Sequence, residues 1–321
     1  MNALRQRDVS PDGGPHVLVL MAVRNGGKNL REQLDSLAAQ EHRRWSLLVS
    51  DDGSTDDSRE ILADFAREGH DVTVLPGPCT GPADNFLSLL RRAGPFLQAE
   101  SLIALCDQDD VWFPGRLSFG LEQLAPLDPA RPAMVFHFTL ITDAALRNPR
   151  RSAARPRAPG FRNALVQNIA SGNTILLNRA GTDLVCAAAM EPEGVVMHDW
   201  WIYQIVTGAG GIAIQDPREV LYYRQHGNNE IGANDGWRDK AVRMALLFQG
   251  RFRAWNATNV AALEASAHRL TPENRALMGL FRDVREGGLG RRLRALWRAR
   301  LYRQSVSSTI ALWVATVLRR M

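Results

Sequence analysis

Residues 102–112 read Leu-Ile-Ala-Leu-Cys-Asp-Gln-Asp-Asp-Val-Trp, an apolar run that ends in three carboxylates, Asp107, Asp109 and Asp110. A short apolar run bounded by polar residues is typical of a buried strand, which places the acids just beyond its carboxyl end. Open α/β sheets bind ligands at that edge. Two carboxylates one residue apart can share one hard divalent cation such as Mg²⁺. The same acids also fit a solvated turn, so the rest of the chain decides between the two interpretations.

The composition is that of an ordinary globular protein. The chain has 321 residues, 45% of them hydrophobic and 23% charged. This length accommodates one large α/β domain with an appendage, or two modest domains. The three cysteines are far apart in the sequence, which predicts neither a disulfide framework nor a thiolate metal site and favours a reducing compartment. No apolar stretch is long enough to span a membrane as a simple helix.

The net charge of +5 is unevenly distributed along the chain. Residues 1–236 hold 22 basic and 29 acidic side chains, whereas residues 237–321 hold 17 basic and 5 acidic ones. A basic block of this kind indicates an anionic partner, either nucleic acid or the surface of an acidic membrane.

Apolar runs and helical spacing alternate along the first third of the chain. Helix-period residues separate four runs that predict strands, at 16–23, 45–49, 72–75 and 102–106. This order predicts right-handed βαβ crossovers, a parallel sheet and an α/β fold class. Further strands are predicted at 134–142, 174–177 and 211–214, and a helix at 200–206.

A second acidic cluster ends the second predicted strand. Asp51 and Asp52 follow 45–49 as Asp107 and Asp109 follow 102–106, so both clusters are expected at the same edge of the sheet. Ser54 to Asp56 are expected to form a turn and helix cap. The first turn, 25–27, lacks the dinucleotide-binding glycine pattern, and no phosphate-loop motif occurs in the chain.

Three other stretches carry candidate functional groups. Gly172 fits either a tight turn or a place where a ligand approaches the backbone closely. Asp199 falls in the first turn of a predicted helix, where the helix dipole alone already favours an acid. Residues 222–229 combine aromatic, cationic, imidazole and amide side chains, and 147–159 is an aperiodic Arg/Pro-rich segment expected to form an exposed loop.

Taken in order, these motifs resemble the inverting family 2 glycosyltransferases, and most of all their bacterial rhamnosyltransferase-like branch. The resemblance covers residues 16–235. It rests on 23–25 (Val-Arg-Asn), 50–56 (Ser-Asp-Asp-Gly-Ser-Thr-Asp), 85–86 (Asn-Phe), 107–112 (Asp-Gln-Asp-Asp-Val-Trp), 198–201 (His-Asp-Trp-Trp) and 223–229 (Tyr-Arg-Gln-His-Gly-Asn-Asn).

The resemblance implies a GT-A fold, a nucleotide-diphospho-sugar donor such as a dTDP- or UDP-sugar, and Mg²⁺ or Mn²⁺. It implies Asp199 as the catalytic base and Gly172 as part of a glycine loop near the acceptor. It also implies that Asp109 is a metal ligand and that His226 is a metal or phosphate ligand. The donor-binding residues that it implies are Val23, Arg24, Asn25, Asp51, Asp52, Asn85 and Asp107, the last of which contacts the ribose or the metal. Arg116 stands where a lysine is expected and keeps its charge.

The chemistry gives each of these groups a task. An acceptor hydroxyl is a poor nucleophile until a positioned carboxylate takes its proton. A divalent metal stabilises the charge that develops on the leaving nucleoside diphosphate. Trp112, Trp200 and Trp201 are candidates for a floor on which a sugar ring stacks, with Trp200 and Trp201 at the acceptor, and core packing is the favoured role for at least one of the three.

The ends of the chain are expected to differ from the domain between them. Residues 1–15 are predicted to be a disordered tail that is neither a signal peptide nor an anchor, and 236–321 a basic helical region. In 291–303, Leu293, Leu296, Trp297 and Leu301 share one helical face, which predicts an interfacial helix. Residues 291–318 are therefore expected to contact an anionic membrane surface. The alternative is a helical appendage packed on the domain, and nucleic acid is not expected because no recognisable module interleaves the basic block.

The function predicted from the sequence is inverting transfer of a sugar to a glycan or lipid-linked glycan acceptor in cell-surface polysaccharide synthesis. The preferred donor is dTDP-rhamnose, which transfers L-rhamnose. The location is cytoplasmic, peripheral on the inner face of the cell membrane. The alternatives are a UDP-hexose transferase, a sugar nucleotidyltransferase and a non-catalytic membrane-bound nucleotide-sugar binder.

Overall fold

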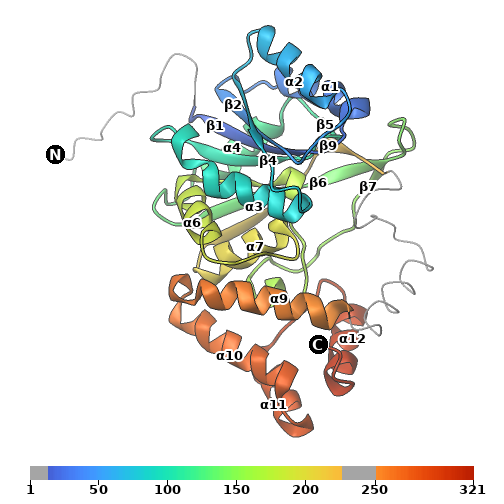
Figure 1. Ribbon diagram of the computed structural model, residues 1–321. Coiled ribbons are helices and arrows are strands. Elements are labelled where there is room, and N and C mark those ends of the chain that lie inside the picture. The colour runs from blue at the N-terminus through green and yellow to red at the C-terminus, as the bar shows by residue number, and fades with distance from the viewer. Residues whose placement is uncertain (1–13, 226–250) are drawn as a thin grey trace, which may run out of the picture.

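A nine-stranded sheet runs through the computed structural model, which describes residues 14–225 and 251–321 (Figure 1). The strand order is β3-β2-β1-β4-β8-β6-β9-β5, and β7 pairs with β6. The strands are β1 (Val17–Val23), β2 (Trp45–Asp51), β3 (Val72–Pro76), β4 (Leu102–Cys106), β5 (Val111–Trp112), β6 (Ala133–Thr142), β7 (Arg150–Arg151), β8 (Leu176–Leu177) and β9 (Ile212–Arg224).

The first half of the sheet is parallel, as predicted. β2 pairs with β1 and β3, and β1 also pairs with β4. In β1, Val17, Val19 and Met21 enter one hydrophobic cluster, while Leu18 and Leu20 enter another on the opposite face. Successive side chains of a strand point to opposite faces, so a strand that is covered on both faces is a continuous apolar run.

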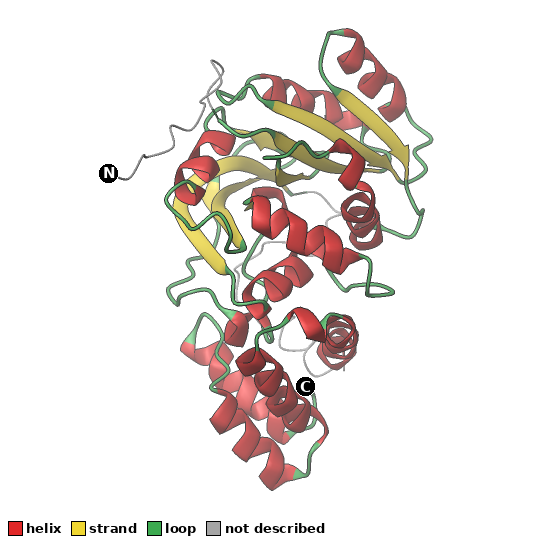
Figure 2. Ribbon diagram, turned by 90° about the vertical axis from the view of Figure 1, so that its left-hand side faces the viewer, coloured by secondary structure: helices red, strands yellow, loops and turns green. Residues whose placement is uncertain are grey.

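Helices cover both faces of the sheet (Figures 1 and 2). One hydrophobic cluster receives α1 (Gly27–Ala38), α2 (Ser58–Arg67) and α4 (Arg116–Leu124). The other receives α3 (Pro82–Arg92), α6 (Arg179–Ala189) and α7 (His198–Gly208). The short helices between strands are η1 (Gly94–Phe96), α5 (Phe161–Ala164) and η2 (Gly172–Thr174).

The second half of the sheet differs from the prediction in direction and in strand length. β8 is antiparallel to both β4 and β6, and β5 is antiparallel to β9. The strand predicted at 174–177 is reduced to two residues, because η2 occupies 172–174. The strand predicted at 211–214 extends to Arg224, because β9 continues along β6 through two register shifts.

Four further helices form the C-terminal region, and the first of them packs against α7. They are α9 (Arg251–Ala265), α10 (Pro272–Glu286), α11 (Leu289–Ala299) and α12 (Val306–Val317), with the 3₁₀ turn η3 (Ala267–Arg269) between the first two. Asn274 of α10 donates hydrogen bonds to the carbonyl oxygens of Thr207 and Gly208 at the end of α7. One hydrophobic cluster contains residues of the α/β part and of these helices, so the helical region is packed on the domain.

This packing corrects the membrane-facing helix face predicted for 291–303. Leu296 and Leu301 are buried and Leu293 is half-buried, because this face of α11 packs toward its neighbouring helices. Only Trp297 is well exposed, at 71%. Within the described residues, no helix combines the length and the apolar character needed to cross a membrane.

The shared cluster predicts one cooperative unfolding unit. Phe281 of α10 is 1% exposed within it, so Phe281→Ala should lower the free energy of unfolding by about 3–5 kcal/mol. Tryptophan fluorescence and far-UV circular dichroism should report one coincident urea transition. Met190→Ala, at a 66% exposed position, is the matched control and should change stability by less than about 0.5 kcal/mol. Two separate transitions, with only one shifted, would contradict the shared cluster.

Candidate active site

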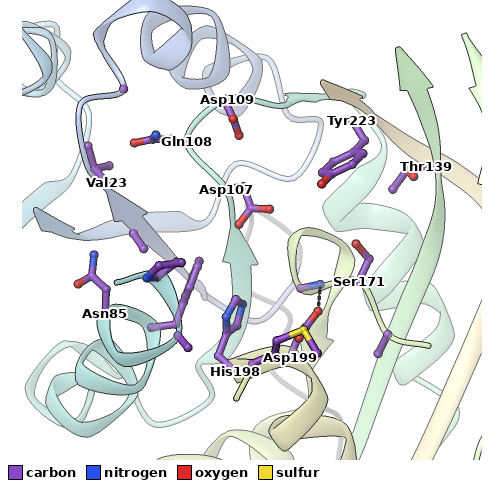
Figure 3. A pocket seen from close by; sticks show the side chains of 18 of the residues that line it. Val23, Asn85, Asp107, Gln108, Asp109, Thr139, Ser171, His198, Asp199 and Tyr223 are labelled. Atoms are coloured by element: carbon purple, nitrogen blue, oxygen red, sulfur yellow. Dashed lines mark hydrogen bonds between the residues drawn. The ribbon is translucent and has the colours of Figure 1, made fainter. Parts of the chain in front are cut away.

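A cavity of about 960 Å³ opens at the carboxyl ends of β1 and β4, the edge at which the sequence predicts a ligand site (Figure 3). Its walls also include the start of α3, residues of β6 and β9, and the segment that leads into η2. The predicted site residues that line the cavity are Val23, Arg24, Asn25, Asp52, Asn85, Asp107, Asp109, Gly172 and Asp199.

Besides Asp52, three carboxylates share this cavity. Asp107, Asp109 and Asp199 come from the loop after β4 and from α7 (Figure 3). Burial raises the pKa of Asp107 to about 7, and the negative charges of Asp109 and Asp199 add to the effect. Like charges held together in a partly desolvated site disfavour ionisation unless a cation offsets them.

A hard divalent cation suits these side chains. In residues 14–225 and 251–321, no group of three or more His, Cys, Asp and Glu side chains is arranged to hold a metal ion. Asp107 and Asp109, which reach the cavity from the loop after β4, could hold such an ion as a pair, and water and substrate oxygens would fill the other positions, as is usual for Mg²⁺. His226, the second predicted metal ligand, lies outside the described residues.

Buried polar contacts fix the loop that carries these acids. Asp110 is fully buried, and its Oδ2 accepts a hydrogen bond from Nδ2 of Asn173 at 2.5 Å. The guanidinium of Arg116 donates to the carbonyl oxygens of Leu105 and Asn173 and lies 3.5 Å from the centre of the Trp112 ring. Burial lowers the pKa of Arg116 to about 9, so it remains a cation at neutral pH. Asp110 and Arg116 thus join the acidic loop to η2.

Asp199 is held by backbone amides in the first turn of α7. Its Oδ1 accepts a hydrogen bond from the N–H of Trp200 at 2.7 Å, and its Oδ2 accepts one from the N–H of Gly172 at 3.2 Å. A Cβ at position 172 would lie 2.7 Å from Nε2 of His198, so only glycine brings this amide to the carboxylate without displacing the imidazole. The sequence predicts a tight turn or a close ligand approach at Gly172, and in the structure the groups that approach Gly172 closely are the side chains of His198 and Asp199 in α7.

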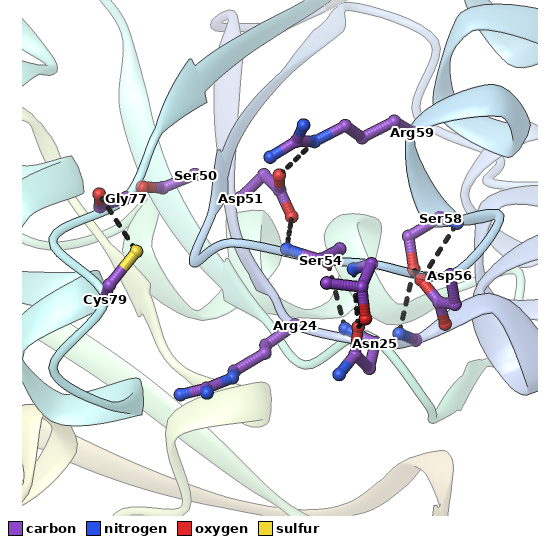
Figure 4. Close-up of polar contacts among 12 residues, drawn as sticks. Arg24, Asn25, Ser50, Asp51, Ser54, Asp56, Ser58, Arg59, Gly77 and Cys79 are labelled. Carbon is purple, nitrogen blue, oxygen red and sulfur yellow. Dashed lines mark hydrogen bonds and ion pairs between the residues drawn. The ribbon is translucent and has the colours of Figure 1, made fainter.

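The turn after β1 depends on the motif that follows β2 (Figure 4). The backbone N–H of Asn25 donates to Oγ of Ser54 at 2.9 Å, and Oδ1 of Asn25 accepts from the N–H of Thr55 at 2.8 Å. Asn25 has a φ of 48°, a left-handed conformation that asparagine tolerates better than most residues. The N-cap position of α2 is Asp57, which makes no side-chain hydrogen bond, but Oδ1 of Asp56 accepts the N–H of Ser58, the first residue of α2, at 3.1 Å, so the predicted cap is supplied by Asp56.

The two acids at the end of β2 have different environments. The carboxylate of Asp52 lines the cavity and accepts hydrogen bonds from the N–H groups of Cys79 and Gly81, at 2.6 and 3.1 Å. Asp51 is not among the lining residues, contrary to its prediction as a donor ligand. Its carboxylate pairs with Arg59 and accepts the N–H of Ser54 instead, because neighbouring side chains of a strand point in opposite directions.

Asn85 offers a buried hydrogen-bond acceptor beside the cavity (Figure 3). Its Nδ2 donates to the carbonyl oxygen of Ser50 at 2.9 Å, which fixes the orientation of the amide. Its Oδ1 is buried and has no hydrogen-bond partner among the described residues. A buried acceptor without a partner is costly, so this atom suits a ligand that donates an N–H or O–H.

Four cationic or imidazole side chains of the cavity wall have no role predicted from the sequence: Lys28, His137, Arg155 and His198. Nη1 of Arg155 is buried without a hydrogen-bond partner in the described part of the chain. Burial lowers the pKa of Arg155 to about 10, and the charge of Asp199 opposes that shift. Arg155 belongs to the segment predicted to be an exposed loop, where no periodicity marks a cavity residue. For His198, the sequence does carry a signal, because the residue directly precedes Asp199 in the motif 198–201.

The predicted tryptophan floor is wrong. Trp112 and Trp200 are 2% exposed and Trp201 is fully buried, and none of them lines the cavity. The indole N–H of Trp200 donates to the carbonyl oxygen of Ala164. α7 lies between the sheet and α9, so its apolar side chains are enclosed on every side. The tryptophans therefore have the core-packing role that was the other prediction for them.

Replacing one acid should reveal the repulsion in the cavity. Without divalent metal, Asp107→Asn should raise the free energy of unfolding at pH 7.5 by about 1 kcal/mol or more, since one pKa unit corresponds to about 1.36 kcal/mol. The raised pKa means that the folded protein binds the proton more tightly than the unfolded chain. This contribution to stability is present below pH 4 and is lost as the pH rises to about 7.

Urea denaturation across that pH range measures the effect, and the variant should lack this part of the pH dependence. Asp183→Asn, at an exposed acid paired with Arg179, is the control and should change stability by less than about 1 kcal/mol. Equal stability and equal pH dependence of the Asp107 variant and the native chain would show that the cavity carries no such repulsion.

Comparison with known proteins agrees with this geometry. Residues 18–170 match the family model for glycosyl transferase family 2. The dTDP-rhamnosyl transferase RfbG of Shigella flexneri is 24% identical over 239 residues, which cover 71% of this chain and 78% of RfbG. The putative glycosyltransferase EpsE of Bacillus subtilis is 31% identical over 122 residues, or 37% of this chain and 41% of EpsE.

Two solved structures share the fold. The mannosyltransferase PcManGT from Pyrobaculum calidifontis, in complex with GDP-Man and Mn²⁺, has a TM-score of 0.51 at 19% identity and covers 99% of this chain and 91% of its own. S. aureus TarS in complex with UDP-GlcNAc has a TM-score of 0.51 at 14% identity and covers 89% and 93%. The chain therefore carries a family 2 glycosyltransferase domain over residues 18–170, and it has the GT-A fold.

Proposed function

We propose that the protein is a metal-dependent inverting glycosyltransferase that transfers L-rhamnose from dTDP-rhamnose to a glycan or lipid-linked glycan in cell-surface polysaccharide synthesis. One observation carries the proposal. A carboxylate fixed by two backbone amides, that of Asp199, shares a single cavity with Asp107 and Asp109 at the carboxyl edge of the sheet. A base and a metal-binding pair are the two parts that direct displacement at a sugar carbon requires.

Asp107 and Asp109 are the proposed metal-binding residues. The raised pKa of Asp107, caused by burial and then by Asp109 and Asp199, supports a bound cation that restores the ionised form. A divalent cation held there supplies Lewis-acid stabilisation of the leaving diphosphate. The P. calidifontis mannosyltransferase was solved with Mn²⁺, which supports Mn²⁺ or Mg²⁺ as the cofactor. His226 remains a proposed further ligand.

The donor would occupy the side of the cavity formed by β1, β2 and α3. The unpartnered Oδ1 of Asn85 suits the N–H of a nucleobase, and both thymine and uracil present such a donor. Arg24 lines the cavity and supplies a cation for the diphosphate, while Val23 and Asn25 shape the first turn. The similarity to RfbG supports the dTDP-rhamnose donor.

Asp199 is the proposed general base. The hydrogen bonds from Trp200 and Gly172 fix the orientation of its carboxylate, so that it can take the proton of an acceptor hydroxyl as that oxygen attacks the sugar. The new bond forms on the face opposite the departing nucleoside diphosphate. A single displacement of this kind inverts the anomeric centre.

The acceptor would enter beside Gly172 and Arg155. A buried guanidinium with an unpartnered nitrogen suits an acceptor that carries negative charge, such as the diphosphate of a lipid-linked glycan. An acceptor of this kind supports a location on the inner face of the cell membrane.

A UDP-hexose donor is the second candidate, because Asn85 does not distinguish uracil from thymine. A non-catalytic binder differs in one testable respect, since it would not require Asp199.

Asp199→Asn should reduce sugar transfer by about 10²–10⁴-fold, because it removes the proton acceptor and keeps the size of the side chain. Transfer is measured as nucleoside diphosphate released in the presence of acceptor. Donor affinity, measured by calorimetry, should change less than about twofold. Asp183→Asn is the control and should retain full turnover. Native turnover by the Asp199 variant would eliminate it as the base, and loss of donor binding would point to misfolding instead.

Asp109→Ala should remove the metal dependence of nucleotide binding. In the native protein, Mn²⁺ should increase the affinity for a dTDP-sugar by at least about 10-fold, and the substitution should abolish this increase. Thermal shift and calorimetry with and without Mn²⁺ measure the difference. If affinity responds to Mn²⁺ equally in both proteins, the metal ligand lies elsewhere.

A further inference from the structure

The exposed apolar side chains of the protein are concentrated in one region. Of the nine large hydrophobic side chains that are exposed in the described residues, seven lie between residues 289 and 318, and the other two are Val74 and Met190. The seven are Leu289, Trp297, Val306, Ile310, Val314, Val317 and Leu318. Scattered exposed hydrophobic residues need no explanation, but a concentration of them marks an interaction surface.

α12 presents most of them as a continuous stripe. Val306, Ile310, Val314 and Val317 recur at helical spacing, which places them on one face, and they are between 44% and 78% exposed. The opposite face of α12 packs inward through Leu312, Ala315 and Thr316. Both faces of α12 are therefore apolar. One packs against the protein and the other faces solvent.

The sequence that surrounds this stripe is basic. The sequence from 287 to 321 contains eight arginines and no acidic residue. Arg319 and Arg320 directly follow α12 and are exposed, as are Arg294 and Arg298 on α11. No ion pair neutralises any of these four within the described part of the chain, whereas Arg291 pairs with Asp283.

We propose that the exposed face of α12, bordered by these arginines, docks the protein on an anionic phospholipid bilayer. Apolar side chains that reach the acyl boundary, together with arginines that meet lipid phosphates, are the two components of interfacial binding. A second copy of the chain is a poorer occupant, because a two-fold contact through this face would bring one set of arginines against another. The surface differs from the face of 291–303 expected from helical spacing, which packs into the protein.

Direct contacts connect this region to the cavity wall. Arg162 donates to the carbonyl oxygen of Ala299, and Asn163 donates to that of Tyr302 at 3.0 Å. Gln304 accepts the N–H of Arg157, two residues after Arg155. The segment that precedes α12 is thus fixed to the loop that carries the proposed acceptor-binding arginine. The bilayer contact does not depend on the proposed function. Only its link to acceptor binding rests on that function.

Vesicle co-sedimentation of the full chain tests the docking surface. The native protein should bind vesicles of equal parts phosphatidylglycerol and phosphatidylcholine, bind phosphatidylcholine vesicles weakly, and be released as salt rises from about 0.1 M to about 1 M. Ile310→Ser combined with Val314→Ser should weaken binding about tenfold or more, because two apolar side chains no longer enter the bilayer. Arg319→Gln combined with Arg320→Gln should weaken binding to the anionic vesicles by a similar factor.

The matched control is Val74→Ser combined with Met190→Ser, which removes the two exposed apolar side chains outside this surface and should leave binding unchanged. Circular dichroism and nucleotide binding without vesicles should be native in all three variants, so failure of the docking surface is distinct from failure of the proposed reaction. Native vesicle binding by the α12 variant would overturn the proposal. So would a dimer in solution, measured by light scattering, that the α12 variant converts to a monomer.

Discussion

The repulsion among carboxylates at the carboxyl edge of the sheet is the constraint on which the site depends. Asp107 and Asp109 follow β4, and Asp199 reaches the same cavity from α7, so the fold concentrates negative charge where burial already penalises it. Such an arrangement lowers stability in the absence of a cation. A site that binds a divalent metal together with a nucleotide sugar converts this cost into affinity, because binding restores the ionised form that the folded protein otherwise disfavours.

Holding these acids in place requires support from the rest of the fold. Buried contacts of Asp110 and Arg116 join the loop after β4 to η2, and the amide of Gly172 fixes the carboxylate of Asp199. The same η2 segment thus orients both the proposed metal-binding loop and the proposed base. A substitution that shifts η2 should therefore alter both at once, even though η2 supplies no acid itself.

The sequence predicts the parallel half of the sheet and the cavity edge because apolar runs and acids mark them directly. It fails where the tertiary packing decides. Spacing alone cannot tell whether α7 is covered on one face or on both, so Trp200 and Trp201 were predicted at the acceptor and lie in the core. The membrane-facing side of 291–303 was misassigned for the same reason. Arg155 enters the cavity from an aperiodic loop, and no local pattern indicates that.

The most direct test is the number of protons released when a dTDP-sugar and Mn²⁺ bind together. Calorimetry in buffers of different ionisation enthalpy measures this number, and the donor diphosphate itself holds no proton near neutral pH. Because the pKa of Asp107 is raised to about 7, binding should release a proton at pH 6 and progressively less as the pH rises above 7, and the release should vanish in Asp107→Asn. Tight binding with no pH-dependent proton release would contradict a cation held by this carboxylate cluster.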